Sequence, residues 1–184
     1  MGSWMRVCVS HYSGEPWLDF MVGRSLMRPR NLLKLFRASL SYAINLGHTR
    51  IKPDDITRGL RTYAQDLVTE VDRELSDVFP QAGKLVYEFS EENAEFWHDD
   101  LSTLVQCIGL DQASAERLIN FLLHFGVLGV RKTGEDTIYI YDVNYDIEML
   151  RVRIRKWGGS TKYIVNPALW PALRVKSGDE PSLI

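Results

Sequence analysis

The sequence predicts a mainly α (α+β) fold in which a helical subdomain precedes a winged helix-turn-helix domain with a small β-hairpin or sheet. Two long stretches before residue 79 carry apolar residues at spacings of three and four, the period of an amphipathic helix. After residue 84 the pattern changes to two shorter helices followed by two strand-like segments. The order helix, turn, helix and hairpin is typical of a winged helix.

The composition fits a globular protein with one ordinary domain or two small ones. Of the 184 residues, 45% are hydrophobic and 25% are charged, unlike the composition of a disordered chain. The net charge of −2 argues against a protein dominated by nucleic-acid contacts. Cys8 and Cys107 fit no metal-binding spacing, and no apolar run is as long as a membrane span. We therefore expect a cytoplasmic protein with reduced thiols, no metal site and no membrane contact.

The helical subdomain is predicted over residues 26–79. Residues 1–25 lack a clear period and are expected to be an irregular N-terminal segment, in which residues 18–22 could form a short strand or the end of a preceding element. A helix over 29–46 begins with Pro29, which suits a first helical turn, and ends before Gly47. Its predicted buried face consists of Leu32, Leu33, Phe36, Leu40, Ala43 and Ile44.

A second long helix completes this subdomain. Pro53 and Asp54 are helix-start signals, and apolar residues recur at helical spacing from there to Val78. Two helices joined by a short connector are expected to pack antiparallel. Residues 79–83 contain proline and glycine and mark the boundary to the next domain.

The winged-helix domain is predicted over residues 84–173. Helices are expected over 99–108 and, after an N-cap at Asp111, over 111–125. Strands are expected over 127–131 and 137–143, with a further strand over 151–156. The polar residues 174–184 are expected to form a loose tail.

Arg28-Pro29-Arg30, at the start of the first long helix, is the segment most suggestive of a function. Two arginines there can simply be solvated, but the helix dipole disfavours cations at this end. A phosphate would explain them, because guanidinium groups, free N–H groups and the dipole all attract an anion there.

Residues 27–35 resemble the start of the helical lid in P-loop ATPases of the AAA and STAND type, where an R-P-R-D/N-L segment carries the sensor-two arginine. The resemblance implies that Arg30, and after it Arg28, contacts a nucleotide. Ile51-x-x-x-Asp55-Ile56 and the following helix resemble the rest of the lid. Residues 163–173 resemble the I-H-P-A-L-x-x-A-L tail of some bacterial P-loop ATPases, with Asn166 in place of the histidine.

The phosphate-binding motif of such an enzyme is missing, because the sequence contains no G-x-x-x-x-G-K-S/T. The chain is therefore expected to be no enzyme by itself, but a non-catalytic C-terminal regulatory or interaction module of an ATPase. It would bind no cofactor alone, whereas a complete ATPase would use ATP and Mg²⁺. The expected partner is another protein, the ATPase core or a second copy of the chain.

DNA binding is the alternative function. The predicted recognition helix over 111–125 offers Arg117 offset by Asp111 and Glu116, which is a poor surface for phosphates. A strand over 151–156 would instead place its arginines on one face, next to Trp157, where they could bind a nucleic-acid backbone. The same pattern also describes a solvated edge strand. The residues of this alternative are Arg151, Arg153, Arg155 and Lys156.

Overall fold

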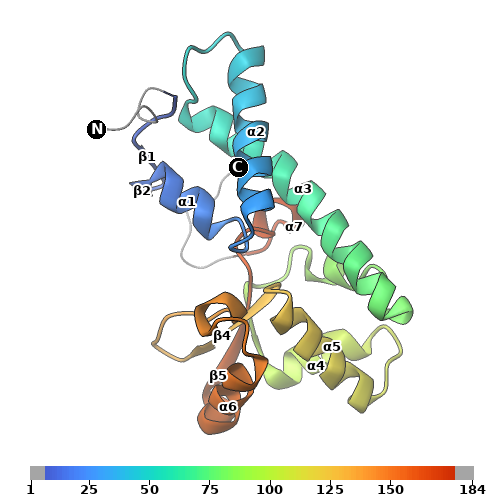
Figure 1. The fold of residues 1–184 in the computed structure, drawn as a ribbon. Helices are drawn as coiled ribbons and strands as arrows, with labels where there is room; N and C mark the ends of the chain where they lie inside the picture. Colours follow the sequence, from blue (N-terminus) through green and yellow to red (C-terminus); the bar gives the residue numbers. More distant parts are fainter. Residues whose placement is uncertain (1–6, 177–184) are drawn as a thin grey trace.

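A computed structural model describes residues 7–176 (Figure 1). The helices are α1 (Trp17–Gly23), α2 (Pro29–Asn45), α3 (Pro53–Val78), α4 (His98–Gln106), α5 (Gln112–His124), α6 (Ile147–Trp157) and α7 (Trp170–Leu173). The strands are β1 (His11–Tyr12), β2 (Glu15–Pro16), β3 (Glu95–Trp97), β4 (Leu128–Lys132) and β5 (Thr161–Val165), and short 3-10 turns occupy Pro80–Ala82, Leu85–Phe89, Ile140–Val143 and Gly158–Ser160. Many helices and two small antiparallel sheets confirm the mainly α (α+β) class.

The upper part of the molecule in Figure 1 contains α1, α2 and α3, and the lower part contains the three-stranded sheet with α4, α5 and α6. The long helix α3 runs from the upper part to the lower one, and α7 packs against it. One continuous hydrophobic cluster includes buried residues from both parts. Within residues 7–176, no helix combines the length and the apolar character needed to cross a membrane.

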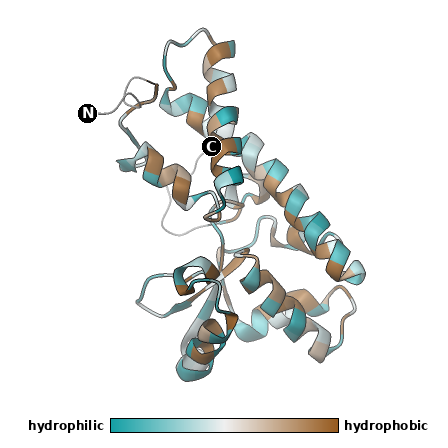
Figure 2. Ribbon diagram, in the orientation of Figure 1, coloured by the Kyte–Doolittle hydropathy of each residue, from teal (hydrophilic) through white to brown (hydrophobic). Residues whose placement is uncertain are grey.

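The two predicted long helices are confirmed, and they pack side by side as α2 and α3. Hydrophobic residues recur among hydrophilic ones along both helices, as in amphipathic helices (Figure 2). The two backbones come very close where Gly59 of α3 faces Ser39 of α2. Further along, the hydroxyl groups of Tyr42 and Thr62 are hydrogen-bonded at 3.0 Å.

The predicted buried face of α2 is wrong for two of its six members, whereas Ala43 is buried and Leu32, Phe36 and Leu40 pack partly buried against the core. Leu33 and Ile44 are 61% and 65% exposed. The fully buried residues of α2 are Asn31, Leu35, Ser39 and Ala43, of which only Ala43 belongs to the predicted face. A periodicity argument selects the most apolar stripe of a helix, whereas the close approach at Gly59 demands small side chains. The side with small residues therefore packs inward.

The N-terminal segment is more regular than the sequence indicates. β1 and β2 form a short antiparallel hairpin, and residues 18–22 lie within helix α1 rather than in a strand. Trp17, Phe20 and Met21 are buried at helical spacing on one face of α1. The ring of Trp17 lies 6.0 Å from that of Phe36, so α1 packs against α2.

The lower part contains the two short helices that the sequence predicts. Asp111 caps α5 by accepting a 2.7 Å hydrogen bond from the backbone N–H of Ser114, and this bond lowers the pKa of the Asp111 carboxyl. Gly109 and Gly126, which end α4 and α5, have φ angles of +83° and +72°. In the sheet, β5 lies between β3 and β4 and is antiparallel to both.

Two predicted strands are wrong. Residues 151–156 lie in helix α6, whose N-terminus is capped by Asp146 through the N–H groups of Glu148 and Met149. This stretch alternates polar and apolar residues, but Leu150 and Ile154 also fit a helical face, and the cap favours the helix. Over residues 137–143 the strand stops after a single bridge at Ile138, and a 3-10 turn follows.

The first residues of the predicted loose tail, 174–176, are held against the fold. The backbone of Lys176 pairs with residues 92–94. Its N–H donates to the Glu92 carbonyl at 2.8 Å, and its carbonyl accepts from the Ala94 N–H at 2.9 Å. This backbone pairing places the end of the described chain beside β3. The rest of the predicted tail, residues 177–184, lies outside the described residues.

The two cysteines are expected to differ in reactivity. Cys107 is exposed, whereas Cys8 is buried, and burial raises the pKa of its thiol to about 11. Since the thiolate is the reactive form, one thiol should react quickly with Ellman's reagent at pH 8 and the second only after denaturation. Because the pKa of Cys8 is higher in the folded chain than its ordinary value of 9.0, this thiol favours the folded state while it is protonated. Its contribution to the free energy of unfolding is therefore lost as the pH rises from 9.0 to about 11. If both thiols of the native protein reacted with Ellman's reagent at the same fast rate, this account would be contradicted.

Candidate functional site

An apolar stripe on α2 that the rest of the chain covers only in part is the main candidate for an interaction site. We define the α2 apolar face as Leu33, Phe36, Leu40 and Ile44, which share one side of the helix at spacings of three and four. Leu33 and Ile44 are mostly exposed, whereas Phe36 and Leu40 are partly buried. Since Leu33 and Leu35 are two residues apart, they point to nearly opposite sides, and Leu35 is buried on the side towards α3. Leu33 and Ile44 therefore point away from the core, whereas Phe36 and Leu40 pack against its edge.

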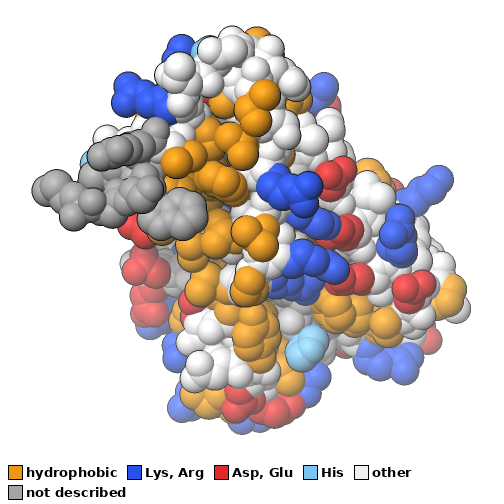
Figure 3. All heavy atoms as spheres, turned by 45° about the horizontal axis from the view of Figure 1, so that its top comes forward, with side chains coloured by type: hydrophobic (Ala, Val, Ile, Leu, Met, Phe, Trp, Pro, Cys, Tyr) orange, Lys and Arg blue, Asp and Glu red, His pale blue; other side chains and the backbone are white. Residues whose placement is uncertain are grey.

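Figure 3 shows hydrophobic side chains gathered in a band on this face of the molecule, next to a group of Lys and Arg side chains. Leu18 in α1, Met27 shortly before α2 and Leu46 at its C-terminal end are also about half exposed. Contiguous apolar surface of this kind on a monomer commonly marks a protein contact.

A basic margin lines the N-terminal end of the α2 apolar face. Arg28 lies at the N-cap of α2, 3.6 Å from the carboxylate of Glu74 and with its guanidinium 5.7 Å from the ring centroid of Phe125. Arg30 lies 3.8 Å from Glu70, which also accepts a hydrogen bond from Lys34. These partly exposed pairs contribute little to stability because water screens them.

The structure distinguishes the two arginines that the sequence selects for a nucleotide. The Arg28 side chain is 32% exposed and lies between α3 and the end of α5, so its contacts within the chain already occupy it. The Arg30 side chain is 68% exposed and has a single ion-pair partner at the limit of contact. Of the two, Arg30 is the one whose guanidinium can reach a group outside the chain.

The four residues of the alternative DNA site do not form one basic face. On helix α6, Arg151 and Arg155 are one turn apart, but Arg153 lies on the opposite side. Arg151 is also occupied, because its Nε donates to Asn120 of α5 at 3.0 Å and its Nη1 donates to Glu148. The arginine ladder predicted for a strand is therefore absent from α6.

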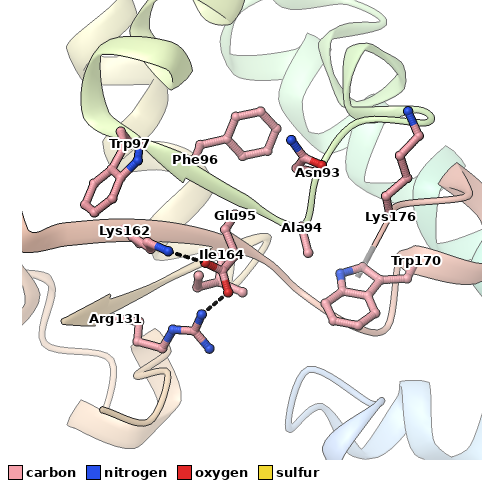
Figure 4. Close-up of a pocket in the computed structure, with 10 residues that line it drawn as sticks. All are labelled: Asn93, Ala94, Glu95, Phe96, Trp97, Arg131, Lys162, Ile164, Trp170 and Lys176. Carbon is pink, nitrogen blue, oxygen red and sulfur yellow. Dashed lines mark hydrogen bonds and ion pairs between the residues drawn. The ribbon is translucent and has the colours of Figure 1, made fainter. Parts of the chain in front are cut away.

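A pocket that sequence reasoning missed lies on the outer face of the three-stranded sheet (Figure 4). It has a volume of about 410 Å³, within the usual range of ligand pockets. Two indoles, three cations and one carboxylate surround an apolar floor at Ala94 and Ile164. These surrounding residues are Trp97, Trp170, Arg131, Lys162, Lys176 and Glu95. No local motif contains this set, because the residues come from segments far apart in the sequence.

A metal site is not apparent in the described part of the chain. Among residues 7–176, no three His, Cys, Asp or Glu side chains come together in a way that could hold a metal ion. The closest histidine and carboxylate, His48 Nδ1 and Asp55 Oδ2, are 2.8 Å apart, and the same carboxylate oxygen accepts from the Lys52 N–H at the start of α3. This pair serves the N-terminus of α3.

Comparison with known proteins gives a partial answer. No curated protein and no solved structure matches the chain. A family model does match the part that contains α1, α2 and most of α3, and so both the α2 apolar face and the two arginines. Residues 2–72 are similar to the FunZ-associated C-terminal helical domain.

Proposed function

We propose that the chain is a non-catalytic accessory module that binds a domain of a P-loop ATPase through the α2 apolar face. The observation that carries this proposal is the orientation of α2, which leaves Leu33 and Ile44 of its most apolar stripe exposed while Asn31, Leu35, Ser39 and Ala43 are buried. Leaving this stripe in water has a cost of about 25 cal/mol per Å² of apolar surface, which a partner would remove.

The similarity of residues 2–72 to a C-terminal helical domain supports an accessory role, because such a domain accompanies other domains of a larger protein. The basic margin supports an interface as well. Arginines beside exposed aliphatic side chains are common among the residues that dominate binding energy. Arg30 and Arg37 both border the α2 apolar face and are exposed.

The nucleotide would belong to the partner domain and not to this chain. The P-loop that holds phosphates is missing from the sequence, so ATP and Mg²⁺ would be bound by the ATPase core. In this proposal Arg30 reaches from the first turn of α2 to that nucleotide and links its phosphate state to the position of the helical subdomain. Arg28 contacts Glu74 and the ring of Phe125 within the chain.

The second half of the chain would serve as a rigid extension of this module. Its order of strand, two helices and two strands, with β5 between β3 and β4, supports the interpretation as a winged helix. The connection between the last two strands contains α6. Duplex-DNA binding by α6 is not part of the proposal, because its basic residues point in different directions.

The proposal is tested by co-expressing the chain with a P-loop domain encoded in the same or a neighbouring gene. We expect the two proteins to co-purify and the chain alone to show no ATP turnover. Arg30→Ala should leave the complex intact but lower its nucleotide affinity or turnover by about 10-fold or more, the usual size of a lost charge-assisted contact. Unchanged nucleotide affinity and turnover would refute the role of Arg30, and a failure to co-purify would refute the partner.

A further inference from the structure

The outer face of the three-stranded sheet carries a row of aromatic and cationic side chains. Trp97 of β3 pairs in register with Lys162 of β5, and Lys162 pairs with Arg131 of β4. Residues paired in this way lie side by side on the same face of a sheet. The neighbouring row on this face consists of Glu95, Ile164 and Gly129. The alternate residues Phe96, Tyr163 and Val130 are buried on the inner face. The outer rows face the pocket except at Gly129, which lies under Tyr139 and Thr137.

Glu95 holds the two central cations in place. One of its carboxylate oxygens accepts from Lys162 Nζ at 2.7 Å, and the other accepts from Arg131 Nη2, as the dashed lines in Figure 4 show. Lys176 adds a third cation at the rim of the pocket. A single carboxylate therefore faces three positive charges, and the pocket keeps a net positive charge that attracts an anion.

Each end of the pocket combines an indole with an ammonium group. At one end Lys162 Nζ lies 5.0 Å from the ring centroid of Trp97, and the Trp97 side chain remains 44% exposed. At the other end Figure 4 shows Trp170 and Lys176 beyond Ala94. Trp170 is held in place, because its Nε1 donates to the carbonyl of Val165 at 2.8 Å. Trp170 is thus fixed at one end of the apolar floor, and Trp97 is exposed at the other.

We propose that this pocket binds single-stranded nucleic acid, with bases against the indoles of Trp97 and Trp170 and phosphates at Lys162, Arg131 and Lys176. Exposed aromatic rings on a sheet, next to cations at the spacing of neighbouring strands, are what unpaired bases and their backbone require. A duplex would offer the indoles no free base face. An acidic peptide would satisfy the cations but would leave the indoles without a specific role.

This inference is independent of the proposed function. The sheet pocket lies in the second half of the chain, outside the matched residues 2–72 and away from the α2 apolar face. The net charge of −2 opposes tight binding of any polyanion, so we expect a modest affinity. Three cations predict a salt dependence with a slope of roughly −2 in log K against log salt for a single strand.

The test is the fluorescence anisotropy of a labelled oligothymidylate of about 12 nucleotides, titrated with the full chain between about 50 and 200 mM salt. Trp97→Ala should weaken binding by about 5- to 100-fold, whereas Trp97→Phe should retain most of it. Lys176→Ala changes only an exposed side chain and should reduce the salt slope by about 0.7. Tyr145→Ala, which removes an exposed aromatic ring outside the pocket, is the matched control and should have no effect.

Four results would overturn the proposal. They are no binding of the oligonucleotide at low salt, equal binding of a duplex of the same length, full competition by free thymidine monophosphate at equal nucleotide concentration, and equal competition by a short polyglutamate. Free nucleotide competition would identify a mononucleotide pocket, and polyglutamate competition would identify a nonspecific cationic surface. Loss of binding in Trp97→Ala counts only if its circular dichroism and melting curve match those of Trp97→Phe.

Discussion

Replacing Gly59 with alanine is expected to lower the free energy of unfolding by about 1–3 kcal/mol, although alanine normally stabilises a helix. A Cβ atom at Gly59 would lie 2.5 Å from the backbone nitrogen of Ser39 and 2.6 Å from its Cα. Backbone atoms cannot rotate away as a flexible side chain could, so α2 and α3 must separate. The clash therefore outweighs the helix propensity of alanine, which is worth about 1 kcal/mol.

The matched control is Gly23→Ala, at the end of α1, where a Cβ atom would meet no heavy atom within 4 Å. This variant should melt at or slightly above the temperature of the unmodified chain. Thermal and urea unfolding of both variants measure the difference. Equal stability of the two alanine variants would show that α2 and α3 are not packed through Gly59.

Replacing Asn166 with alanine is expected to destabilise the fold by about 2–4 kcal/mol, because two buried backbone groups would lose their partners. The Asn166 side chain is fully buried; its Nδ2 donates to the carbonyl of Gly126 at 2.9 Å, and its Oδ1 accepts from the N–H of Ala168 at 3.0 Å. It joins the end of α5 to the segment that follows β5. The Asn166 side chain thus holds this part of the fold together.

Asn45→Ala is the control for this prediction, since Asn45 is exposed at the end of α2. Its effect should stay within about 0.5 kcal/mol. The measurement is urea denaturation of both variants. If their m-values are equal, the difference between their midpoints reports a difference in the free energy of unfolding. If Asn166→Ala were as stable as Asn45→Ala, the bridge between Gly126 and Ala168 would have no energetic importance.

Helices α2, α3 and α5 were predictable from the sequence because their signals are local. Pro29 and Pro53 occupy the first turns of α2 and α3, and Asp111 caps α5. The orientation of α2 was not predictable, because it depends on a close contact between Ser39 and Gly59, which are twenty residues apart in the sequence. Periodicity identifies the apolar stripe of a helix but not the partner that covers it.

The lower part was less predictable for a related reason. β3 has three residues and is stabilised by pairing with β5, which lies more than sixty residues later. Arg151–Lys156 shows both strand-like alternation and helical period, and the cap at Asp146 accounts for the helix. The sheet pocket depends on this pairing, because only the register brings Trp97, Lys162 and Arg131 into one row. Single-sequence patterns contain no information on that register.

The α2 apolar face is where the packing differs most from the expectation. Its leucines and isoleucine fit a predicted core, yet α3 packs on the other side of the helix. A partner domain that covers Leu33 and Ile44 would complete this core from outside. A second copy of the chain could cover the same face, and size-exclusion chromatography with light scattering separates the two cases. A chain that is monomeric alone and enters a complex with the P-loop domain fits the proposal, whereas a stable homodimer lost on mutation of the face contradicts it.

The most direct test is isothermal titration calorimetry of the P-loop domain with the Leu33→Asp/Ile44→Asp double variant. Both substitutions lie at exposed positions, so the variant should fold as the unmodified chain does. We predict a loss of affinity of about 100-fold or more, because two charges would be buried without partners in the interface. The control Gln65→Asp/Thr69→Asp places two added carboxyl groups at exposed positions of α3 and should bind like the unmodified chain. Equal affinity of the two double variants would contradict the assignment of the α2 apolar face as the binding surface.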